Sequence, residues 1–195
     1  WLPFWMDLRC RAAFFRPLTA LTHMADYRLW DAWPVLMHVH SLAWFAALLW
    51  AVATLYRRLM GMPPRPRAPP GDALSSTLRV GPETSGALPA WVAVLAALLF
   101  ALDDAHAVPA GWLANRNTLI AGLFGVLALL AYDRWRRDGW RPGAVRAPLA
   151  LAAGLLAKEE AVCAAAFLLA YALFLDAGAW RRRVAALVPS MLVGA

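Results

Sequence analysis

The sequence predicts an all-α protein, namely a polytopic transmembrane helical bundle with an external interfacial helix and loop. Three observations predict this fold class. Hydrophobic residues occupy 62% of the 195 positions and charged residues only 16%, whereas a soluble domain carries about 25% charged residues. The mean hydropathy is positive, at +0.54. The basic residues gather in short clusters between apolar runs, which is the pattern of loops in membrane proteins.

Composition also argues against other classes of protein. The formal net charge is +7 and 18 of the 19 basic residues are arginine, but they do not form one basic face, so we expect no nucleic-acid partner. Cys10 and Cys163 have no metal-like spacing, and Cys163 lies in an apolar run, so no disulfide framework is expected. The chain begins at Trp1 and stops inside an apolar run. We therefore expect residues 1–195 to be a single membrane domain that is a fragment of a longer protein.

Six apolar segments define the expected helices. A straight transmembrane helix needs about 20 residues. The first two segments reach this length alone, and the third reaches it if its helix starts inside the preceding loop. We expect membrane helices at residues 36–56, 84–102, 112–132, 147–157, 161–175 and 184–195, an external loop at 1–35 whose aromatic residues suit an interfacial helix, and a Pro- and Arg-rich cytoplasmic linker at 57–83.

The fourth and fifth segments form either one long helix with charges in its middle or two short helices that meet at a charged corner. The arginines decide between these alternatives. They cluster in 57–83, 133–146 and 176–183, and the positive-inside rule places all three clusters in the cytoplasm. Two short helices with a corner at 158–160 satisfy this requirement, and a single helix does not. The sequence therefore predicts a hairpin.

The opposite face of the membrane is then built from residues 1–35, 103–117 and 158–160. The four histidines (His23, His38, His40 and His106) and the only lysine, Lys158, lie in these segments or at their edges. His38 and His40 are one residue apart, so a helix turns them to different faces and a two-histidine metal site is not expected. Residue types that carry catalysis thus concentrate on one side, while plain arginines occupy the other.

Residues 103–117 are the most informative polar segment. Asp103 and Asp104 are adjacent carboxylates, which can bind a divalent ion or a cationic group or push one another's pKa apart. Arg116 lies between two asparagines, and its guanidinium can grip phosphate oxygens. The alternative is an ordinary polar loop with internal salt bridges. We expect Asp103, Asp104, His106 and Arg116 to converge with Lys158 on one polar pocket, where the sequence indicates no particular cofactor and a divalent metal is possible.

Lys158, Glu159 and Glu160 interrupt an otherwise apolar stretch. Ionisable groups at membrane depth are costly and usually mark a functional site. The alternative is a plain interfacial turn. A lysine that faces lipid phosphates has an obvious use, so we favour the functional interpretation.

Several segments resemble elements of one enzyme group. Residues 15–19 read Phe-Arg-Pro-Leu-Thr and resemble the Arg-Pro-Leu-Thr element in the first external loop of the GT-C superfamily, in the branch of protein O-mannosyltransferase-like and tetratricopeptide-linked membrane enzymes with their bacterial relatives. Residues 34–41 resemble its Pro-x-x-Tyr-His-x-x-Asn element, with Met37 and Ser41 in place of Tyr and Asn. Residues 100–119 resemble its third block, in which His106, Trp112, Arg116 and Leu119 are in register. Residues 156–159 resemble its Leu-Ser-Lys-Glu element.

The order of these elements follows the family from about residue 14 to 175, with two departures. Asp103-Asp104 replaces the family's His-Pro, and Val108 replaces an acidic residue. The resemblance implies an integral-membrane glycosyltransferase that uses a polyprenyl-phosphate-linked sugar donor at the outer face of a bacterial inner (plasma) membrane. It implies membrane lipid and an unidentified protein or glycan acceptor as further partners. The family's principal catalytic Asp would precede Trp1.

The resemblance also suggests roles for individual residues. Asp104 and His106 would be catalytic on the acceptor side. Arg16, Asp103, Arg116, Lys158 and Glu159 would bind substrate, with Arg116 and Lys158 on the phosphate. Two alternatives stay open, a transporter or flippase fragment for a lipid-linked substrate and a structural membrane protein without chemistry.

Overall fold

A computed structural model describes residues 15–30, 33–61, 88–176 and 178–194 of the protein. Every regular element in this described part is helical, which confirms the all-α prediction. The elements are α1 (Pro17–Trp30), α2 (Pro34–Met60), α3 (Ala90–Leu102), η1 (Asp104–His106), α4 (Ala107–Gly111), η2 (Leu113–Asn115), α5 (Arg116–Asp138), α6 (Gly143–Ala157), η3 (Glu159–Val162), α7 (Cys163–Phe174) and α8 (Trp180–Gly194). Residues 1–14 and 31–32 of the expected external loop, 62–83 of the expected linker and 84–87 of the expected second membrane helix lie outside the described residues.

Two helices of the described part, α2 and the run Leu113–Asp138, are long and apolar enough to cross a membrane. The helices Ala90–Leu102 and Asp104–Gly111 pass the same test as a pair but are bent by 50° at the break between them, so they make a third span if the bent pair counts as one. Helix α6 is apolar but shorter. Two or three apolar helices are consistent with a membrane protein, and the six spans expected from the sequence stay a prediction.

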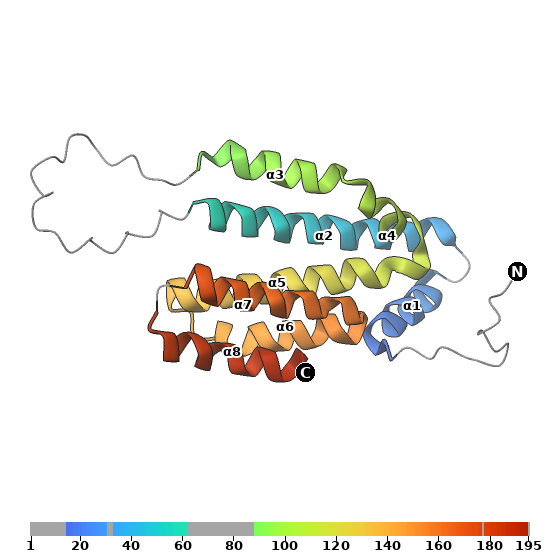
Figure 1. Cartoon of the computed structure of the whole chain (residues 1–195). Coiled ribbons are helices and arrows are strands. Elements are labelled where there is room, and N and C mark those ends of the chain that lie inside the picture. Colours follow the sequence, from blue (N-terminus) through green and yellow to red (C-terminus); the bar gives the residue numbers. More distant parts are fainter. Residues whose placement is uncertain (1–14, 31–32, 62–87, 177, 195) are drawn as a thin grey trace, which may run out of the picture.

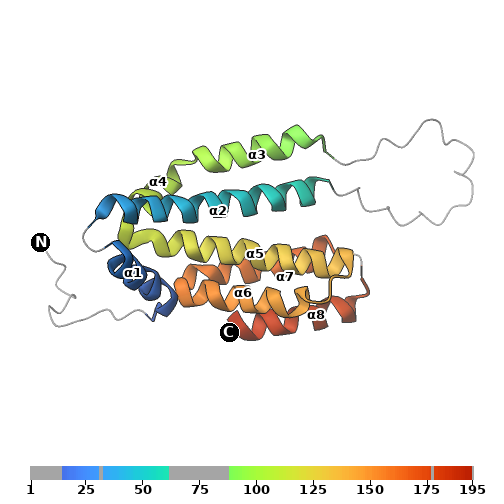
Figure 2. The ribbon, with the colours of Figure 1, turned by 180° about the vertical axis from the view of Figure 1, so that it is seen from behind.

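The long helices lie side by side, with the connections gathered at two ends (Figures 1 and 2). At one end, α1 and α4 lie across the helix ends and the chain reverses at Lys158 between α6 and α7. We call this the α1 end. At the other end, the arginine end, lie the end of α2, the 139–142 turn between α5 and α6, the end of α7 and the start of α8. The described parts of the segments expected on opposite membrane faces therefore lie at opposite ends of the bundle.

Helix boundaries follow local chemistry and differ from the expected ones. Pro34 begins α2, where its missing N–H costs nothing because the first turn has no acceptor for it. Helix α5 continues past the expected end at 132 to Asp138, and the following Gly139 adopts a left-handed φ of 70° that glycine tolerates best. The expected loop at 133–146 is thus largely the ends of α5 and α6.

Small residues bring α5, α6 and α7 together. A Cβ atom on Gly154 of α6 would lie 2.9 Å from the Cβ atom of Ala161, and one on Gly125 of α5 would lie 3.2 Å from the Cβ atom of Ala164. Such close approach increases van der Waals contact, which stabilises helix pairs that have no water to exclude. The core between these helices is built around the buried side chains of Leu151 and Leu168.

Candidate functional site

The α1 end contains a completely buried guanidinium, that of Arg116 at the start of α5. Its Nε donates to the Ser41 hydroxyl (2.8 Å) and its Nη2 donates to the Met37 carbonyl oxygen (2.7 Å). Its Nη1 forms an ion pair with the Asp26 carboxylate, which is also buried. Because these partners come from α1 and α2, Arg116 ties three helices together.

His40 extends this buried network on α2. The indole N–H of Trp44, which can only donate, lies 3.0 Å from His40 Nε2, so Nε2 is the accepting nitrogen of the ring. The hydrogen therefore resides on Nδ1, which lies 2.5 Å from Asp26 Oδ1 and donates to it. Asp26 thus accepts from His40 on one oxygen and from Arg116 on the other. The carboxylate is held by a ring hydrogen and a guanidinium, and its orientation is set by both.

His23 lies on α1 close to the same network. Burial lowers the pKa of the His23 imidazole below its ordinary value of 6.5, and the nearby positive charge of Arg116 lowers this pKa further. The ring is consequently neutral at neutral pH.

Helix α1 is fastened to the corner between α6 and α7 by two contacts. The Arg16 guanidinium reaches both carboxylate oxygens of Glu159, at 3.1 Å from Nε and 2.5 Å from Nη2, which is the forked geometry that suits an arginine–carboxylate pair. The Thr19 hydroxyl donates to the Ala157 carbonyl oxygen (2.9 Å). The hydrogen bonds from Arg16 hold the pKa of Glu159 below its ordinary value.

Lys158 lies at this corner, mostly buried, and reaches towards the start of α5. Its ammonium donates to the Thr118 hydroxyl (2.8 Å) and pairs with Glu160 (2.5 Å). The Thr118 hydroxyl in turn donates to the side-chain oxygen of Asn115 (3.1 Å). Lys158 is therefore close to the first turn of α5, in which Arg116 also lies.

The expected convergence of five residues on one pocket is met only in part. Arg116 and Lys158 lie at the same end of the bundle but bond to different partners. Asp103 and Asp104 are exposed, and within the described residues neither bonds to Arg116 or Lys158. Asp103 accepts from the backbone N–H of Ala105 (2.9 Å) and so caps the short helix η1.

The imidazole of His106 packs between aromatic rings. Its centroid lies 4.4 Å from that of Phe100 and 5.4 Å from that of Phe45. One edge of the ring lines an apolar groove of about 720 Å³ between α2, α3, α5 and α7, which we call the main groove. The polar residues Thr118 and Glu160 line the same groove. His106 thus lines the groove, whereas Asp104 is exposed and does not line it.

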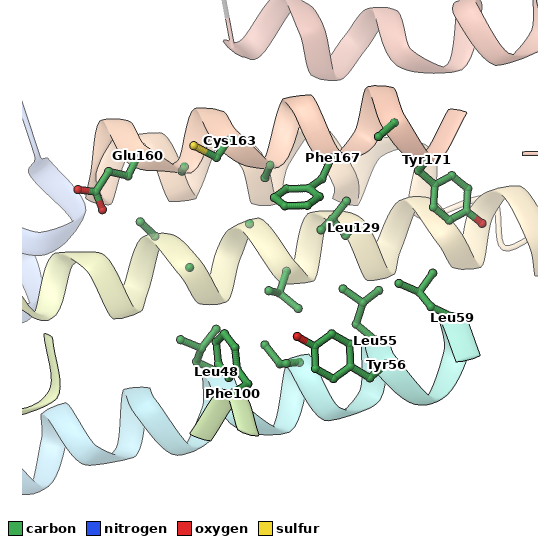
Figure 3. A pocket seen from close by; sticks show the side chains of 18 of the residues that line it. Leu48, Leu55, Tyr56, Leu59, Phe100, Leu129, Glu160, Cys163, Phe167 and Tyr171 are labelled. Atoms are coloured by element: carbon green, nitrogen blue, oxygen red, sulfur yellow. The ribbon is translucent and has the colours of Figure 1, made fainter. Parts of the chain in front are cut away.

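The main groove has a polar end and a long apolar remainder. Figure 3 shows Glu160 at one end, with Cys163 and Phe167 following it along α7 towards Tyr171. Both partners of the Lys158 ammonium, Thr118 and Glu160, belong to the polar end. The Lys158 ammonium therefore adjoins the polar end of the main groove. This arrangement fits an amphipathic molecule with a negatively charged headgroup.

A divalent metal fits this site poorly. The described residues contain no group of three or more His, Cys, Asp or Glu side chains that could hold a metal ion. Among the described residues the Asp103–Asp104 pair has no third ligand, and one of its carboxylates already serves as a helix cap.

Sequence reasoning missed the acids that matter most in the structure. Asp26 carries no distinguishing pattern in the sequence, yet it is the partner of Arg116. At the arginine end, buried Asp133 accepts from Arg58 Nε (2.5 Å) and from the Tyr171 hydroxyl (2.7 Å). The only available signal was physical: a buried arginine loses hydration energy and therefore needs a nearby carboxylate as partner. This requirement does not show which carboxylate is the partner.

Asp176 is a third acid that the sequence did not single out. Burial raises the pKa of its carboxyl group, but hydrogen bonds from Arg136 (2.6 and 3.2 Å) and from the Gly178 N–H outweigh burial and lower this pKa overall. The acids that the structure describes at the arginine end are thus engaged by arginines.

Comparison with known proteins adds no relative to this picture. No protein-family model, no curated protein and no solved structure matches this chain.

Proposed function

We propose that this chain is part of an integral, multi-pass membrane glycosyltransferase that takes its sugar from a polyprenyl-phosphate carrier at the outer face of a bacterial plasma membrane. The order of the GT-C-like elements supports this proposal, as does their contact at the α1 end. The first element, 15–19, bonds to the fourth, 156–159. Arg116 of the third element bonds to Met37 and Ser41 of the second. Four segments that are far apart in the sequence thus make one assembly.

The observation that carries the proposal is the position of Lys158 beside the polar end of the main groove. A polyprenyl phosphate is a long apolar chain with an anionic head, and the groove offers an apolar lining next to an ammonium. A phosphate that approaches Lys158 would take the place of Glu160, whose side chain is exposed. The lysine then faces the phosphate through which the sugar is linked.

The proposed chemistry follows from this arrangement. Sugar transfer breaks the bond between the sugar and the carrier phosphate, and negative charge develops on the departing phosphate. Lys158 would stabilise that charge, where electrostatic stabilisation lowers the barrier most. His106, at the polar end of the groove, and exposed Asp104 would shape the acceptor side. A carboxylate base would deprotonate the acceptor.

The structure changes the role that we propose for Arg116. Its donors are directed to Asp26, Ser41 and Met37, and the side chain is fully buried. A phosphate could reach it only after this network opened. We therefore assign it a positioning role, in which it holds the second and third elements together, while Arg16 with Glu159 fastens the first element to the fourth.

The test measures sugar transfer by the protein that contains this chain, reconstituted in liposomes with a panel of polyprenyl-phosphate sugars. We expect Lys158→Ala to lower turnover at least about tenfold, which is about 1.4 kcal/mol of transition-state stabilisation. Lys158→Arg should restore only part of it, because a planar guanidinium does not replace a compact ammonium. Full turnover in Lys158→Ala would remove the lysine from the mechanism.

Two controls separate catalysis from folding. Thr118→Val removes the hydrogen bond that Lys158 makes but leaves the ammonium in place, so it should lower turnover much less than Lys158→Ala. Arg146→Ala, on an exposed arginine of α6 near the arginine end, should leave turnover unchanged. Absence of transfer by the unaltered protein with every donor in the panel would contradict the transferase itself.

A flippase for a lipid-linked substrate is the second candidate. The lateral exposure of the main groove favours it, since Phe167 lines the groove and is 64% exposed. The test follows a fluorescent lipid-linked sugar in liposomes that contain the protein. Movement of this lipid from one leaflet to the other, without transfer of its sugar to any acceptor, would support the flippase over the transferase.

A further inference from the structure

A second apolar groove, of about 510 Å³, lies between α7 and α8 on a different side of the bundle from the main groove. We call it the α7/α8 groove. Apolar side chains of both helices line it, among them Leu173, Val188 and Leu192, and the last of these is 74% exposed. Trp180 and Arg183, both near the start of α8, line the same groove. The groove is thus apolar along its length and has an aromatic and a cationic side chain where α8 begins.

Two arginines at this point, Arg181 and Arg182, are not paired with any acid of the described residues. Within the described part of the chain, exposed Arg181 and Arg182 make no ion pair, and Arg183 donates to backbone oxygens, including that of Gly178 (2.5 Å). The acids of the arginine end are engaged by other arginines: Asp133 and Asp138 pair with Arg58, and Asp176 pairs with Arg136. The start of α8 therefore carries positive charge that the fold leaves uncompensated.

The helical register connects this charge with the groove. Arg181 precedes Val188 by seven residues and Leu192 by eleven, so the three side chains share one stripe of α8. Val188 and Leu192 line the groove, which places Arg181 on the same side. Positive charge in the first turn also opposes the helix dipole, and a bound anion would relieve that repulsion.

We propose that the α7/α8 groove and the arginines at its head form a binding site for a bilayer phospholipid with an anionic headgroup. An acyl chain lies along the groove, Trp180 lies at the level of the headgroups, and Arg181 contacts the phosphate. Charge complementarity favours this occupant over another helix, because an apolar helix would cover the groove and leave the arginines uncompensated. The site lies at the opposite end from Lys158 and does not depend on the proposed function.

The test uses phosphatidylglycerol and phosphatidylcholine that carry a photoactivatable group in the acyl chain, incorporated into nanodiscs with the full protein. Mass spectrometry of peptides locates the cross-links. We expect phosphatidylglycerol to label the groove residues of α7 and α8 at least about fivefold more than phosphatidylcholine does. Arg181→Ala should abolish that preference. Arg57→Ala is the matched control, because Arg57 is an exposed arginine in the last turn of α2, also at the arginine end. This variant should keep the preference for phosphatidylglycerol.

Three outcomes would overturn the proposal. Equal labelling by the two lipids would show that the arginines select no headgroup. No labelling of α7 and α8 in the groove would show that another segment of the protein fills it. Displacement of phosphatidylglycerol by a polyprenyl phosphate at equimolar amount would identify the carrier lipid as the occupant. Val188→Trp fills the groove without changing its charge, and it should lower labelling by both lipids while thermal unfolding stays near that of the unaltered protein.

Discussion

Arg116 and Asp26 form a buried ion pair. The pair is compatible with a stable fold only when both side chains are present. Each ion loses several kcal/mol of hydration when it is buried, and only good geometry with additional hydrogen bonds offsets this loss. The structure supplies those bonds from Ser41, Met37 and His40. The pair is therefore a positioning device for α1, α2 and α5, and its removal should act on folding before it acts on any ligand.

A double-mutant cycle tests this interpretation. Arg116→Met leaves the Asp26 carboxylate buried without its main partner and should destabilise the protein by roughly 3–5 kcal/mol. Asp26→Leu should do the same to the guanidinium. The double variant should be more stable than either single variant, because no unpaired charge remains. Thermal unfolding in detergent gives the three values. Additive losses would show that the two side chains do not act as a pair.

At the scale of the element, α1 is held to the bundle partly by charge. The Arg16–Glu159 fork and the Thr19 hydroxyl bond join the start of α1 to the corner that follows α6. Since α1 carries both the first GT-C-like element and the partner of Arg116, its attachment decides whether the α1 end keeps its geometry. A charged tether of this kind responds to pH.

The tether should weaken in acid. Hydrogen bonds from Arg16 lower the pKa of Glu159 below its ordinary value of 4.5, so this contact contributes stability that is present above pH 4.5 and is lost as the pH falls through the lowered value. Spin labels at Leu21→Cys on α1 and Phe167→Cys on α7, with the native cysteines replaced, report the distance between the helices. We expect its distribution to broaden below about pH 4.5.

Glu159→Gln provides the control for this pH effect. The amide cannot titrate, so its distance distribution should already be broad at neutral pH and should not change with acid. If the unaltered protein and Glu159→Gln broaden over the same acidic range, another carboxyl group is responsible for the change.

The pairing of α5 with α6 depends on glycine in a way that can be measured. A Cβ atom on Gly143 would meet the carbonyl oxygen of Ala131 and lie 2.7 Å from the Cβ atom of Trp135. Gly143→Ala should therefore destabilise the protein, although alanine normally favours helix over glycine by up to about 1 kcal/mol. Gly111→Ala meets no atom within 4 Å and should be neutral or slightly stabilising. Equal thermal unfolding of the two variants would contradict this account of the close approach.

At the scale of the whole molecule, the two ends of the bundle carry different charged residues. The exposed arginines of α5, α6 and α8 gather at the arginine end, together with the 139–142 turn. The α1 end holds Lys158 and the buried network. The positive-inside rule then predicts the orientation, with 57–83, 133–146 and 176–183 in the cytoplasm.

Cysteine accessibility in intact cells tests this orientation. Arg136 is a poor labelling position because it pairs with Asp176, so exposed Arg141 is the better choice. A cysteine at Arg141 should react with an impermeant reagent only after the membrane is opened, while one at exposed Ala114 should react in intact cells. Strong labelling at Arg141 from outside would reverse the topology and remove the proposed site from the outer face.

Particular residues show how far the sequence alone could lead. Apolar runs and arginine clusters indicated the helices around α2 and α5 and the break at Lys158, because these features depend on local composition. Residues 103–117 and 158 were recognised as the unusual polar positions for the same reason. Their partners were not recognisable, since Arg116 contacts residues 75 to 90 positions away and no local pattern encodes such contacts.

The sequence by itself determined the all-helical class, the apolar segments and the separation of plain arginines from the histidines and Lys158. Only the tertiary structure decided that Arg116 is buried with Asp26, that His106 turns towards the main groove and Asp104 stays exposed, and that Lys158 adjoins the polar end of that groove. The physical reason is that periodicity and composition act over a few residues, whereas the pairing of a buried charge depends on which helices pack together.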